Sequence, residues 1–384
     1  MPKVHRITLL VEPSTSYGRD ILRGIARYAR TRANWLFEFE HAASSHEVLQ
    51  YGVPDTDGVI LRNVKPETAA KLKKRGLAVV HVGAERKTDE FPGVTVDDPS
   101  VGRAAARYFI HRGYRRFAAC GFPERLFSSA RIAAYVAALS GEGLACEEHR
   151  EPLGVWAGTP VPERTARLVP WLKTLQGPTA LFCCNDEMGR HVAEACRLAN
   201  VRVPEDVAVL GVDNDEVLCE LSNPPLSSVE LGAERIGYQA AALLARRLAG
   251  KAVPASVRCV APVGVVTRRS TEHQPIEDPL VSAAVRFIWE HAAEGLDVGE
   301  LVRAMKVSRR WLELRFQHVL GSSPAAQIRE VQIERARKLL AETDLLMPAV
   351  ASNSGFGDAK LLIAVFRREV GMTPTEYRDQ YRLR

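Results

Sequence analysis

Polar and charged side chains lie at the ends of several runs of aliphatic and β-branched residues in the first two thirds of the chain. Open parallel sheets bind ligands beyond the carboxyl ends of their strands, so residues in these positions can share one site. Carboxylate, amide and guanidinium groups together suit a ligand rich in hydroxyl groups, and the same carboxylates could serve acid–base catalysis. The residues in such positions are Glu12 to Tyr17, Asp97, Asp98, Ser128 to Arg131, Asn185, Asp186 and Asp213 to Asp215.

The last third of the chain contains a second set of groups, which suits nucleic acid. Asp297 is a plausible N-cap for a helix over residues 298–305, and Ser308 can cap a helix over residues 309–321. Two short helices joined by a tight turn form a helix-turn-helix unit, whose second helix enters the major groove of DNA. The residues that could meet phosphates and base edges are Ser308, Arg309, Arg310, Glu313 and Gln317.

The same arrangement returns at the end of the chain. A short helix over residues 349–354 and a glycine-containing turn precede Asp358, which can cap a helix over residues 359–371. Between the two units, Pro324 lies near the start of a long amphipathic pattern, so one connecting helix should fix their spacing. The units could then read adjacent major-groove segments about 34 Å apart. The basic candidates in the second unit are Lys360, Arg367 and Arg368.

The elements that position these groups fall into two kinds. Up to about residue 266, short β-branched runs alternate with helical patterns, which is the signature of a parallel α/β fold, and the rhythm spans two successive units. We expect a helix over residues 101–113 to close the first unit. A polar, proline-containing segment then breaks the rhythm, and only helical patterns follow it. The predicted organisation is an α/β region over residues 1–270, a linker over residues 271–279 and an all-α domain over residues 280–384.

The composition excludes some classes and permits others. A net charge of +6 and a pI near 9.0 permit nucleic-acid binding without demonstrating it. No run approaches the roughly 20 apolar residues that cross a bilayer, and the first residues lack a signal-peptide pattern, so we expect a cytoplasmic protein without a membrane partner. The seven cysteines form no CxxC pair with metal-ligand spacing. We expect no cofactor and no bound metal.

The helical domain resembles the DNA-binding domain of the AraC family of transcription regulators. The segment GFGDAKLLIAVFRREVGMTPTEYR, residues 355–378, carries the likeness, together with SRRWLELRF upstream. The resemblance implies double-stranded DNA as a partner. Where relatives often carry polar or basic residues on the second recognition helix, this chain has Ala359, Leu361, Ile363 and Ala364. We therefore expect the second unit mainly to grip the DNA backbone while the first reads sequence.

The α/β region resembles the effector domain of the LacI family, a two-lobed, periplasmic-binding-protein-like sensor. The likeness includes SSARIAAY, TALFCCNDEMGRHVAEA and VPEDVAVLGVDN. It implies that Arg131, Asn185 and Asp213 contact a sugar in the cleft between the lobes, with Asp98 and Trp156 as weaker matches. Tyr17 is added from the first strand-to-helix loop. Asp186 is also a candidate, although it could instead cap a helix, and Trp156 could be a core residue.

A LacI-like sensor joined to an AraC-like domain resembles a type of bacterial sugar-responsive regulator. The likeness implies D-xylose or a related pentose as effector and activation of catabolic genes as output. We expect a homodimer, because each protomer supplies one DNA footprint and two protomers would bind a repeated site. A repressor, or a response to another monosaccharide, remains an alternative. A sugar-modifying enzyme or a transport-type sugar receptor is the rival class. The sequence contains no Walker loop, no GxGxxG and no HExxH, so we expect no enzyme.

Overall fold

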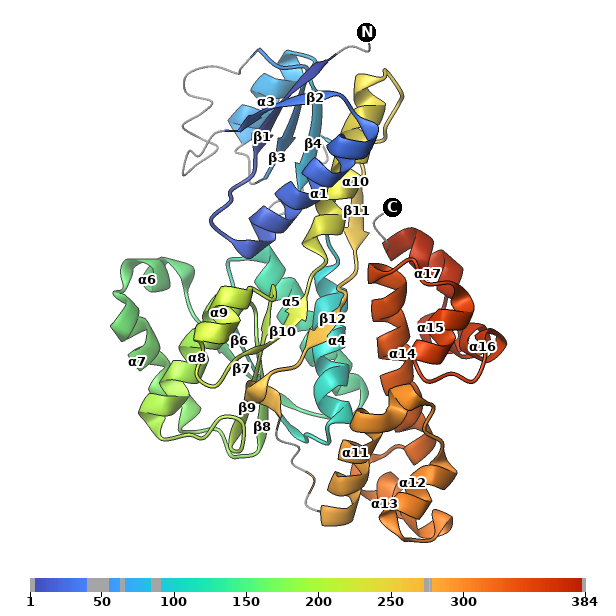
Figure 1. Ribbon diagram of the computed structural model, residues 1–384. Coiled ribbons are helices and arrows are strands. Elements are labelled where there is room, and N and C mark those ends of the chain that lie inside the picture. The colour runs from blue at the N-terminus through green and yellow to red at the C-terminus, as the bar shows by residue number, and fades with distance from the viewer. Residues whose placement is uncertain are drawn as a thin grey trace.

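The computed structural model describes residues 4–39, 55–62, 66–83, 91–272, 276 and 278–381. Two α/β lobes, blue to yellow in Figure 1, lie one above the other, and a helical domain, orange to red, lies beside them. This is the predicted fold class: a two-lobed sensor-like region followed by an all-α domain with two helix-turn-helix units.

The first lobe is built on a parallel sheet with strand order β11-β5-β4-β3-β1-β2. Helices α1 (Ser16–Arg32) and α10 (Ala233–Leu248) pack against each other at very close range. A Cβ at Gly24 would lie 1.9 Å from the backbone oxygen of Glu234, and one at Gly237 would lie 1.9 Å from that of Ile21, so both positions require glycine. The other elements are β1 (His5–Leu10), β2 (Trp35–Phe39), β3 (Gly58–Leu61), α3 (Pro66–Lys74), β4 (Ala78–Val82), β5 (Gly93–Val96) and β11 (Val257–Val260).

The second lobe repeats this plan with strand order β12-β10-β9-β8-β6-β7, in which only β12 is antiparallel to its neighbour. Its strands β8 and β9 are buried along their whole length, which is why they read as continuous apolar runs in the sequence. The elements are β6 (Arg116–Gly121), α5 (Leu126–Gly141), β7 (Cys146–Arg150), α6 (Leu153–Gly158), α7 (Val161–Leu172), β8 (Thr179–Cys183), α8 (Asp186–Ala199), β9 (Val207–Val212), α9 (Glu216–Leu221), β10 (Ser227–Glu230) and β12 (Gly264–Val266).

The chain crosses between the lobes at three places. It leaves β5 of the first sheet for helix α4 (Asp98–His111), leaves β10 of the second sheet for α10, and leaves β11 of the first sheet for β12 of the second. One sequence expectation is corrected here, because α4 does not close the first lobe. It packs along α5 of the second lobe, and Asp98 in its first turn lies beside residues of the first lobe. The crossings form the hinge between the lobes.

The helical domain has two small hydrophobic cores, one for each helix-turn-helix unit. Local signals in the sequence set its helix starts: Asp297 forms a capping box with Glu300, and Ser308 and Asp358 accept bonds from the backbone N–H groups of Trp311 and Leu361. Among the described residues, no helix is long and apolar enough to cross a membrane. The short helix η1 (Arg269–Thr271) precedes this domain and packs against β9 and β10 of the second lobe. The elements of the helical domain are α11 (Pro279–His291), η2 (Ala292–Glu294), α12 (Val298–Met305), α13 (Arg309–Leu320), α14 (Pro324–Glu342), α15 (Met347–Asn353), α16 (Ala359–Val370) and α17 (Pro374–Tyr381).

Candidate ligand cleft and nucleic-acid interface

A cavity of about 490 Å³ lies between the lobes, beyond the carboxyl ends of strands from both sheets. Its volume falls within the range of small-molecule sites. Tyr17, Arg62 and Gly83 line it from the first lobe. Six of the seven predicted ligand residues border this one cavity: Tyr17, Asp98, Arg131, Trp156, Asn185 and Asp213.

Arg131 of α5 is the central cation of the cavity, and its side chain is 5% exposed. Its Nε donates to Asp98 Oδ1 at 2.8 Å, and its Nη1 donates to the backbone oxygen of Cys184 at 2.7 Å. Nη1 also lies 3.8 Å from Asp213 Oδ1. Because an unpaired buried guanidinium would be costly, these partners hold it charged and fixed in direction. The arrangement presents a rigid donor to a ligand between two acceptors.

The carboxylates of Asp98 and Asp213 are acceptors on two sides of the cavity. Burial raises the pKa of both groups, while the positive charge of Arg131 opposes that rise. Asp213 has φ of 110°, a conformation that non-glycine residues rarely adopt, and this strain fits a side chain that the fold holds in place for binding. Hydroxyl groups of a polyol could donate to these oxygens.

Asn185 and Asp186 differ in role, although they are adjacent. Asn185 lines the cavity, and its Oδ1 caps α8 by accepting from the backbone N–H of Met188 at 2.9 Å, which leaves the amide N–H groups to face a ligand. Asp186 is not among the residues that line the cavity. Its buried carboxyl accepts bonds from Ser228 Oγ at 2.6 Å and from the backbone N–H of Asp215 at 2.8 Å. The structure therefore corrects the expectation that Asp186 faces the ligand, because these bonds direct it into the second lobe.

Two aromatic side chains form apolar walls of the cavity. The Trp156 ring packs edge-on against Phe122 and His191, so it is both a core residue and part of the lining. Tyr17 lies under the guanidinium of Arg62, whose carbon is 4.7 Å from the ring centroid. Burial raises the pKa of Tyr17, so its hydroxyl stays protonated and can donate a hydrogen bond.

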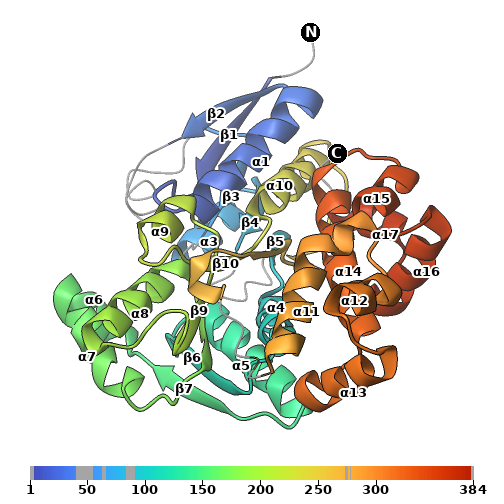
Figure 2. The same cartoon turned by 60° about the horizontal axis from the view of Figure 1, so that its bottom comes forward.

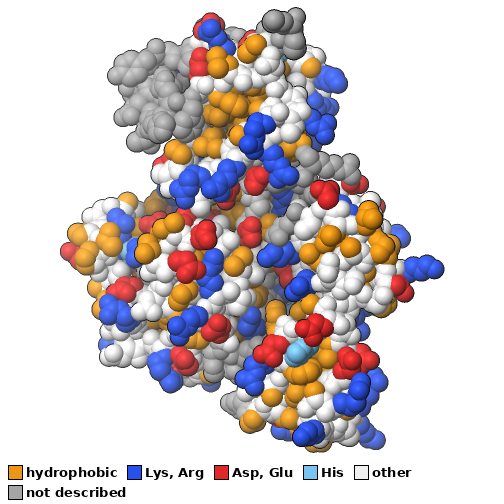
Figure 3. All heavy atoms as spheres, viewed as in Figure 1, with side chains coloured by type: hydrophobic (Ala, Val, Ile, Leu, Met, Phe, Trp, Pro, Cys, Tyr) orange, Lys and Arg blue, Asp and Glu red, His pale blue; other side chains and the backbone are white. Residues whose placement is uncertain are grey.

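The predicted DNA-binding residues lie on the exposed surface of the helical domain. All eight are exposed, and Figure 3 shows Lys and Arg side chains along the outer edge of this domain, with apolar side chains between them. Helix α14 joins the two units and, at 19 residues, is about 28 Å long. The eight residues are Ser308, Arg309, Arg310, Glu313, Gln317, Lys360, Arg367 and Arg368.

These eight side chains differ in their availability. Arg309 pairs with Glu313 at 2.9 Å, and Arg368 pairs with Glu369. The side chains of Arg310, Lys360 and Arg367 make no hydrogen bond or ion pair within the described part of the chain. The three unpaired cations are therefore the ones most available to phosphates or base edges.

Known proteins contain the α/β region and the helical domain together in one chain. Residues 106–271 match the model of a periplasmic binding protein-like domain, and residues 301–380 match the model of a helix-turn-helix domain. The xylose operon regulatory protein of Escherichia coli strain K12 is 31% identical to this chain, and the alignment covers 98% of the chain and 97% of that protein. The chain belongs to this family of regulatory proteins.

Other comparisons agree with this family assignment. The xylose operon regulatory protein of Haemophilus influenzae is 29% identical over 97% of this chain and 98% of its own length. A solved structure of a xylose-binding transcription activator matches the whole of both chains, with a TM-score of 0.62 and 29% identity. The complex of the regulator CelR with cellobiose, at 22% identity, matches 70% of this chain and 86% of its own with a TM-score of 0.57, which shows the fold of the α/β region. As a member of the family, the chain is a transcription regulator, not an isolated binding domain.

Several members of the cavity lining were not among the predicted ligand residues. Arg62 follows the last residue of β3, a position that could have suggested it, whereas Arg164 lies near the start of α7, where no sequence signal marks it. On the DNA side, Leu314 of α13 is 63% exposed. The sequence could have indicated this, because the buried residues of α13 are Leu312, Phe316 and Leu320, and Leu314 does not share their face. The remaining polar members of the cavity lining are Glu12, Thr15, Thr95, Arg125 and Glu187.

Proposed function

We propose that this regulator binds a monosaccharide in the cleft between its lobes and double-stranded DNA with its two helix-turn-helix units, and that the sugar changes how it binds DNA. The observation that carries the proposal is the buried Arg131, which Asp98 and Asp213 hold in the cavity of a chain that also has a DNA-binding domain. The relatives' names support D-xylose, or a related pentose, as the effector and activation as the output.

The proposed contacts follow from the geometry of the cleft. Arg131 and Asn185 donate to sugar hydroxyl groups, and Asp98 and Asp213 accept from them. The faces of Tyr17 and Trp156 pack against the C–H groups of the ring. Because Asp98 lies at the hinge and Asp213 follows a strand of the second lobe, a ligand that touches both favours one arrangement of the lobes.

On the DNA side, the proposal assigns base reading to the first unit and backbone contact mainly to the second. Arg310 and Leu314 lie on the outward face of α13, and a leucine can contact the methyl group of thymine. On α16, Lys360 and Arg367 lie one turn before and after Ala364, whose side chain offers no hydrogen-bonding group to a base edge. Ser308, Arg309, Glu313, Gln317 and Arg368 complete the proposed interface.

The proposal also covers the state of the protein in the cell. It acts in the cytoplasm, where the DNA of a bacterial cell lies, and it acts as a homodimer, because two protomers double the DNA footprint. It catalyses no reaction on the sugar, since its relatives are regulators and the carboxylates of the cleft are occupied with Arg131. It requires neither a cofactor nor a metal.

A titration series tests the proposal. The purified protein is titrated with D-xylose, other pentoses and hexoses by calorimetry, and its affinity for a DNA fragment selected from a random pool is measured with and without each sugar. We expect binding of a pentose and a change in DNA affinity of roughly 5- to 150-fold. A protein that ignores sugars, or whose DNA affinity no sugar changes, would contradict the proposal. Conversion of the sugar during the titration would favour the enzyme alternative.

A further inference from the structure

Helix α4 reaches from the ligand cleft to the helical domain. Asp97 caps its start, and the carboxylate of Asp98 in its first turn accepts a hydrogen bond from Arg131. The helix has 14 residues and is therefore about 21 Å long, and its last turn lies at the helical domain. Figures 1 and 2 both show α11 and α14 beside it. One rigid element thus has a cleft residue at one end and the DNA-binding domain at the other.

The end of α4 and the turn after it contact three helices of the helical domain. His111 Nδ1 lies 3.4 Å from Glu330 Oε1 of α14, and the guanidinium of Arg112 lies 4.8 Å from the ring centroid of Trp289 on α11. Arg115 Nη2 donates to the backbone oxygen of Val319 on α13 at 3.1 Å. We call this set of contacts the interdomain seam.

Arg112 is the most deeply buried member of the seam. It is 5% exposed and stacks on Tyr108 as well as on Trp289, while Nη1 donates to the backbone oxygen of Thr271 at 3.3 Å. Gly113, with φ of 87°, brings the backbone so close that a Cβ there would lie 2.9 Å from Ile276 of the first unit's core. The seam is therefore a packed interface that fixes orientation.

The position of α14 determines the position of both helix-turn-helix units. Gln332 in the middle of α14 donates to the backbone oxygens of Ala292, in the loop before the first unit, and Gly355, in the turn of the second. Residues of α14 belong to both cores. A force applied to α14 at Glu330 would therefore move the two DNA-reading helices as a pair.

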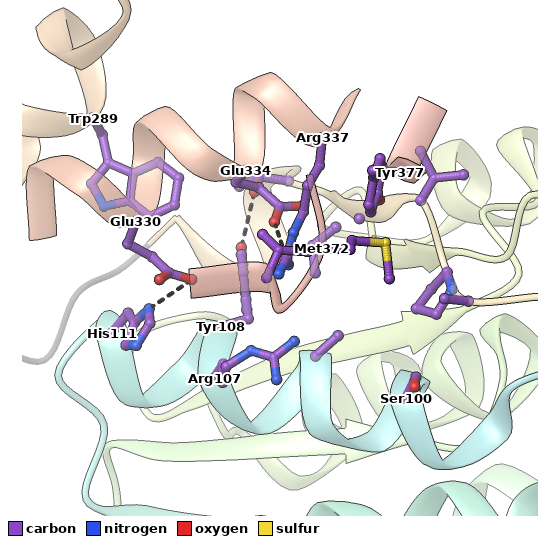
Figure 4. Close-up of a pocket in the computed structure, with 18 residues that line it drawn as sticks. Ser100, Arg107, Tyr108, His111, Trp289, Glu330, Glu334, Arg337, Met372 and Tyr377 are labelled. Carbon is purple, nitrogen blue, oxygen red and sulfur yellow. Dashed lines mark hydrogen bonds and ion pairs between the residues drawn. The ribbon is translucent and has the colours of Figure 1, made fainter. Parts of the chain in front are cut away.

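A cavity of about 260 Å³ borders the seam at His111 and Glu330 and extends between α4 and α14, and Figure 4 shows its lining. Arg107 and His111 face it from α4, and Glu330, Glu334 and Arg337 face it from α14. The hinge residues Ala261, Pro262 and Val263 form another wall, and Ala261 packs against the core of the second unit. The segment that crosses between the lobes thus borders this cavity and touches the DNA-binding domain.

We infer that the pair His111–Glu330 is a positioning contact, through which the sugar-dependent arrangement of the lobes sets the orientation of α14 and of the DNA-reading helices. This inference rests on the proposed function of the cleft. Neither residue touches the sugar or the DNA. They act through α4, whose first turn belongs to the ligand site, and through α14, which carries both units.

The electrostatics of the seam support a contact of this kind. Burial opposes ionisation of Glu330, yet its hydrogen bond and charge contact with His111, helped by Arg337 and Arg107, hold its pKa below the ordinary value. Arg107 has no hydrogen bond or ion pair within the described residues, and burial followed by the charge of Arg337 lowers its pKa. A positive charge at position 330, in place of the carboxylate, would therefore lie close to His111, Arg107 and Arg337.

The test uses the full-length protein and a matched control. Glu330→Gln removes the charge and Glu330→Lys reverses it. The same two changes at Glu294 affect an exposed pair with His291 that lies within the helical domain and does not join it to α4. For each variant, the D-xylose affinity is measured without DNA, and the DNA affinity is measured with and without D-xylose. The thermal transition reports folding.

We expect all variants to bind D-xylose with unchanged affinity in the absence of DNA. In Glu330→Gln the factor by which D-xylose changes DNA affinity should fall about 2- to 5-fold, the effect of a partly exposed ion pair, and in Glu330→Lys it should fall further. The double variant His111→Glu, Glu330→Lys reverses both charges of the pair, so it should restore part of the factor by which D-xylose changes DNA affinity. The D-xylose affinity measured with DNA bound must change by the same factor, because the coupling is reciprocal.

The outcomes separate this inference from the proposed function. If D-xylose changes DNA binding by the unaltered protein and by both Glu330 variants equally, the positioning role is wrong and the proposed function stands. If the Glu294 variants lose as much coupling as the Glu330 variants, the seam has no special role. If the unaltered protein shows no coupling, the proposed function itself fails, and the seam has nothing to transmit.

Discussion

The ligand cleft and the DNA-binding surface use the same charged residue types in opposite ways. In the cleft, Arg131 is buried and its hydrogen-bonding groups are directed by Asp98, Asp213 and a backbone oxygen. On the helical domain, Arg310, Lys360 and Arg367 are exposed and have no ion pair among the described residues. The cleft is preorganised for one small ligand, whereas the surface keeps mobile cations for a long polyanion. Mutations in the two regions should therefore differ in size and in kind.

The largest effect is expected for Arg131→Ala. The change removes a hydrogen-bond donor from the cleft and leaves the buried carboxylates of Asp98 and Asp213 without their cation. Removing one partner of a buried ion pair lowers the free energy of unfolding by about 3–5 kcal/mol. Calorimetry should find D-xylose binding weakened by more than about 100-fold. DNA affinity without sugar should change little. Retention of full D-xylose affinity would show that the cleft is not the sugar site.

A pH effect is expected from His191, which packs behind Trp156 in the cleft wall. Burial, together with the charges of Arg190 and Arg164, lowers its pKa from 6.5 to about 4. Between pH 6.5 and 4, His191 is protonated in the unfolded chain but still neutral in the folded chain. The contribution of His191 to the free energy of unfolding is therefore complete above pH 6.5 and is lost as the pH falls toward 4. Urea unfolding should show a loss of up to about 3 kcal/mol over this range.

His191→Gln should remove that part of the pH dependence. His318→Gln, at an exposed position of α13, is the matched control and should leave the dependence unchanged. An equally steep loss of stability in His191→Gln would mean that other groups cause it.

A smaller effect is expected for the arginines of the first unit. Arg310→Ala removes an unpaired cation and should weaken binding to the selected DNA about 10-fold, with a change in base preference at one position. Arg309→Ala should cost less, because Arg309 is already paired with Glu313. Fluorescence anisotropy on the selected fragment and its single-base variants measures both. Equal losses of DNA affinity in the two variants would show that the ion pair with Glu313 does not limit the contact of Arg309 with DNA.

The smallest effect is expected for Lys360→Ala in the second unit. If this unit grips the backbone, affinity should fall about threefold for every DNA sequence alike, and the slope of log affinity against log salt should decrease by about 1. A salt titration on the selected and a scrambled fragment provides the measurement. A loss confined to the selected fragment would show that the second unit also reads bases.

The same contrast explains what could be predicted. The helical domain was predicted in detail because its signals are local: Asp297, Ser308 and Asp358 cap helices within a few residues of themselves. For the cleft, the family likeness alone indicated Trp156. Strand-end positions indicated the other five residues of the lining that were predicted, and the likeness supported all of these but Tyr17: Tyr17, Asp98, Arg131, Asn185 and Asp213. Arg164 escaped prediction because an arginine on a helix looks the same in sequence whether its side chain faces a ligand or solvent. Asp186 was misplaced because neighbouring residues after a strand point in different directions.

The sequence by itself determined the class of each domain, the sites where most helices begin, and a set of polar residues at strand ends that belong to one cleft. Only the tertiary structure decided that α4 packs on the second lobe, that β11 and β12 join different sheets, and that His111 meets Glu330 across the seam. The physical reason is the range of the forces. Capping and hydrophobic periodicity act within one or two turns, whereas these pairings join residues far apart in the chain and depend on which surfaces pack together.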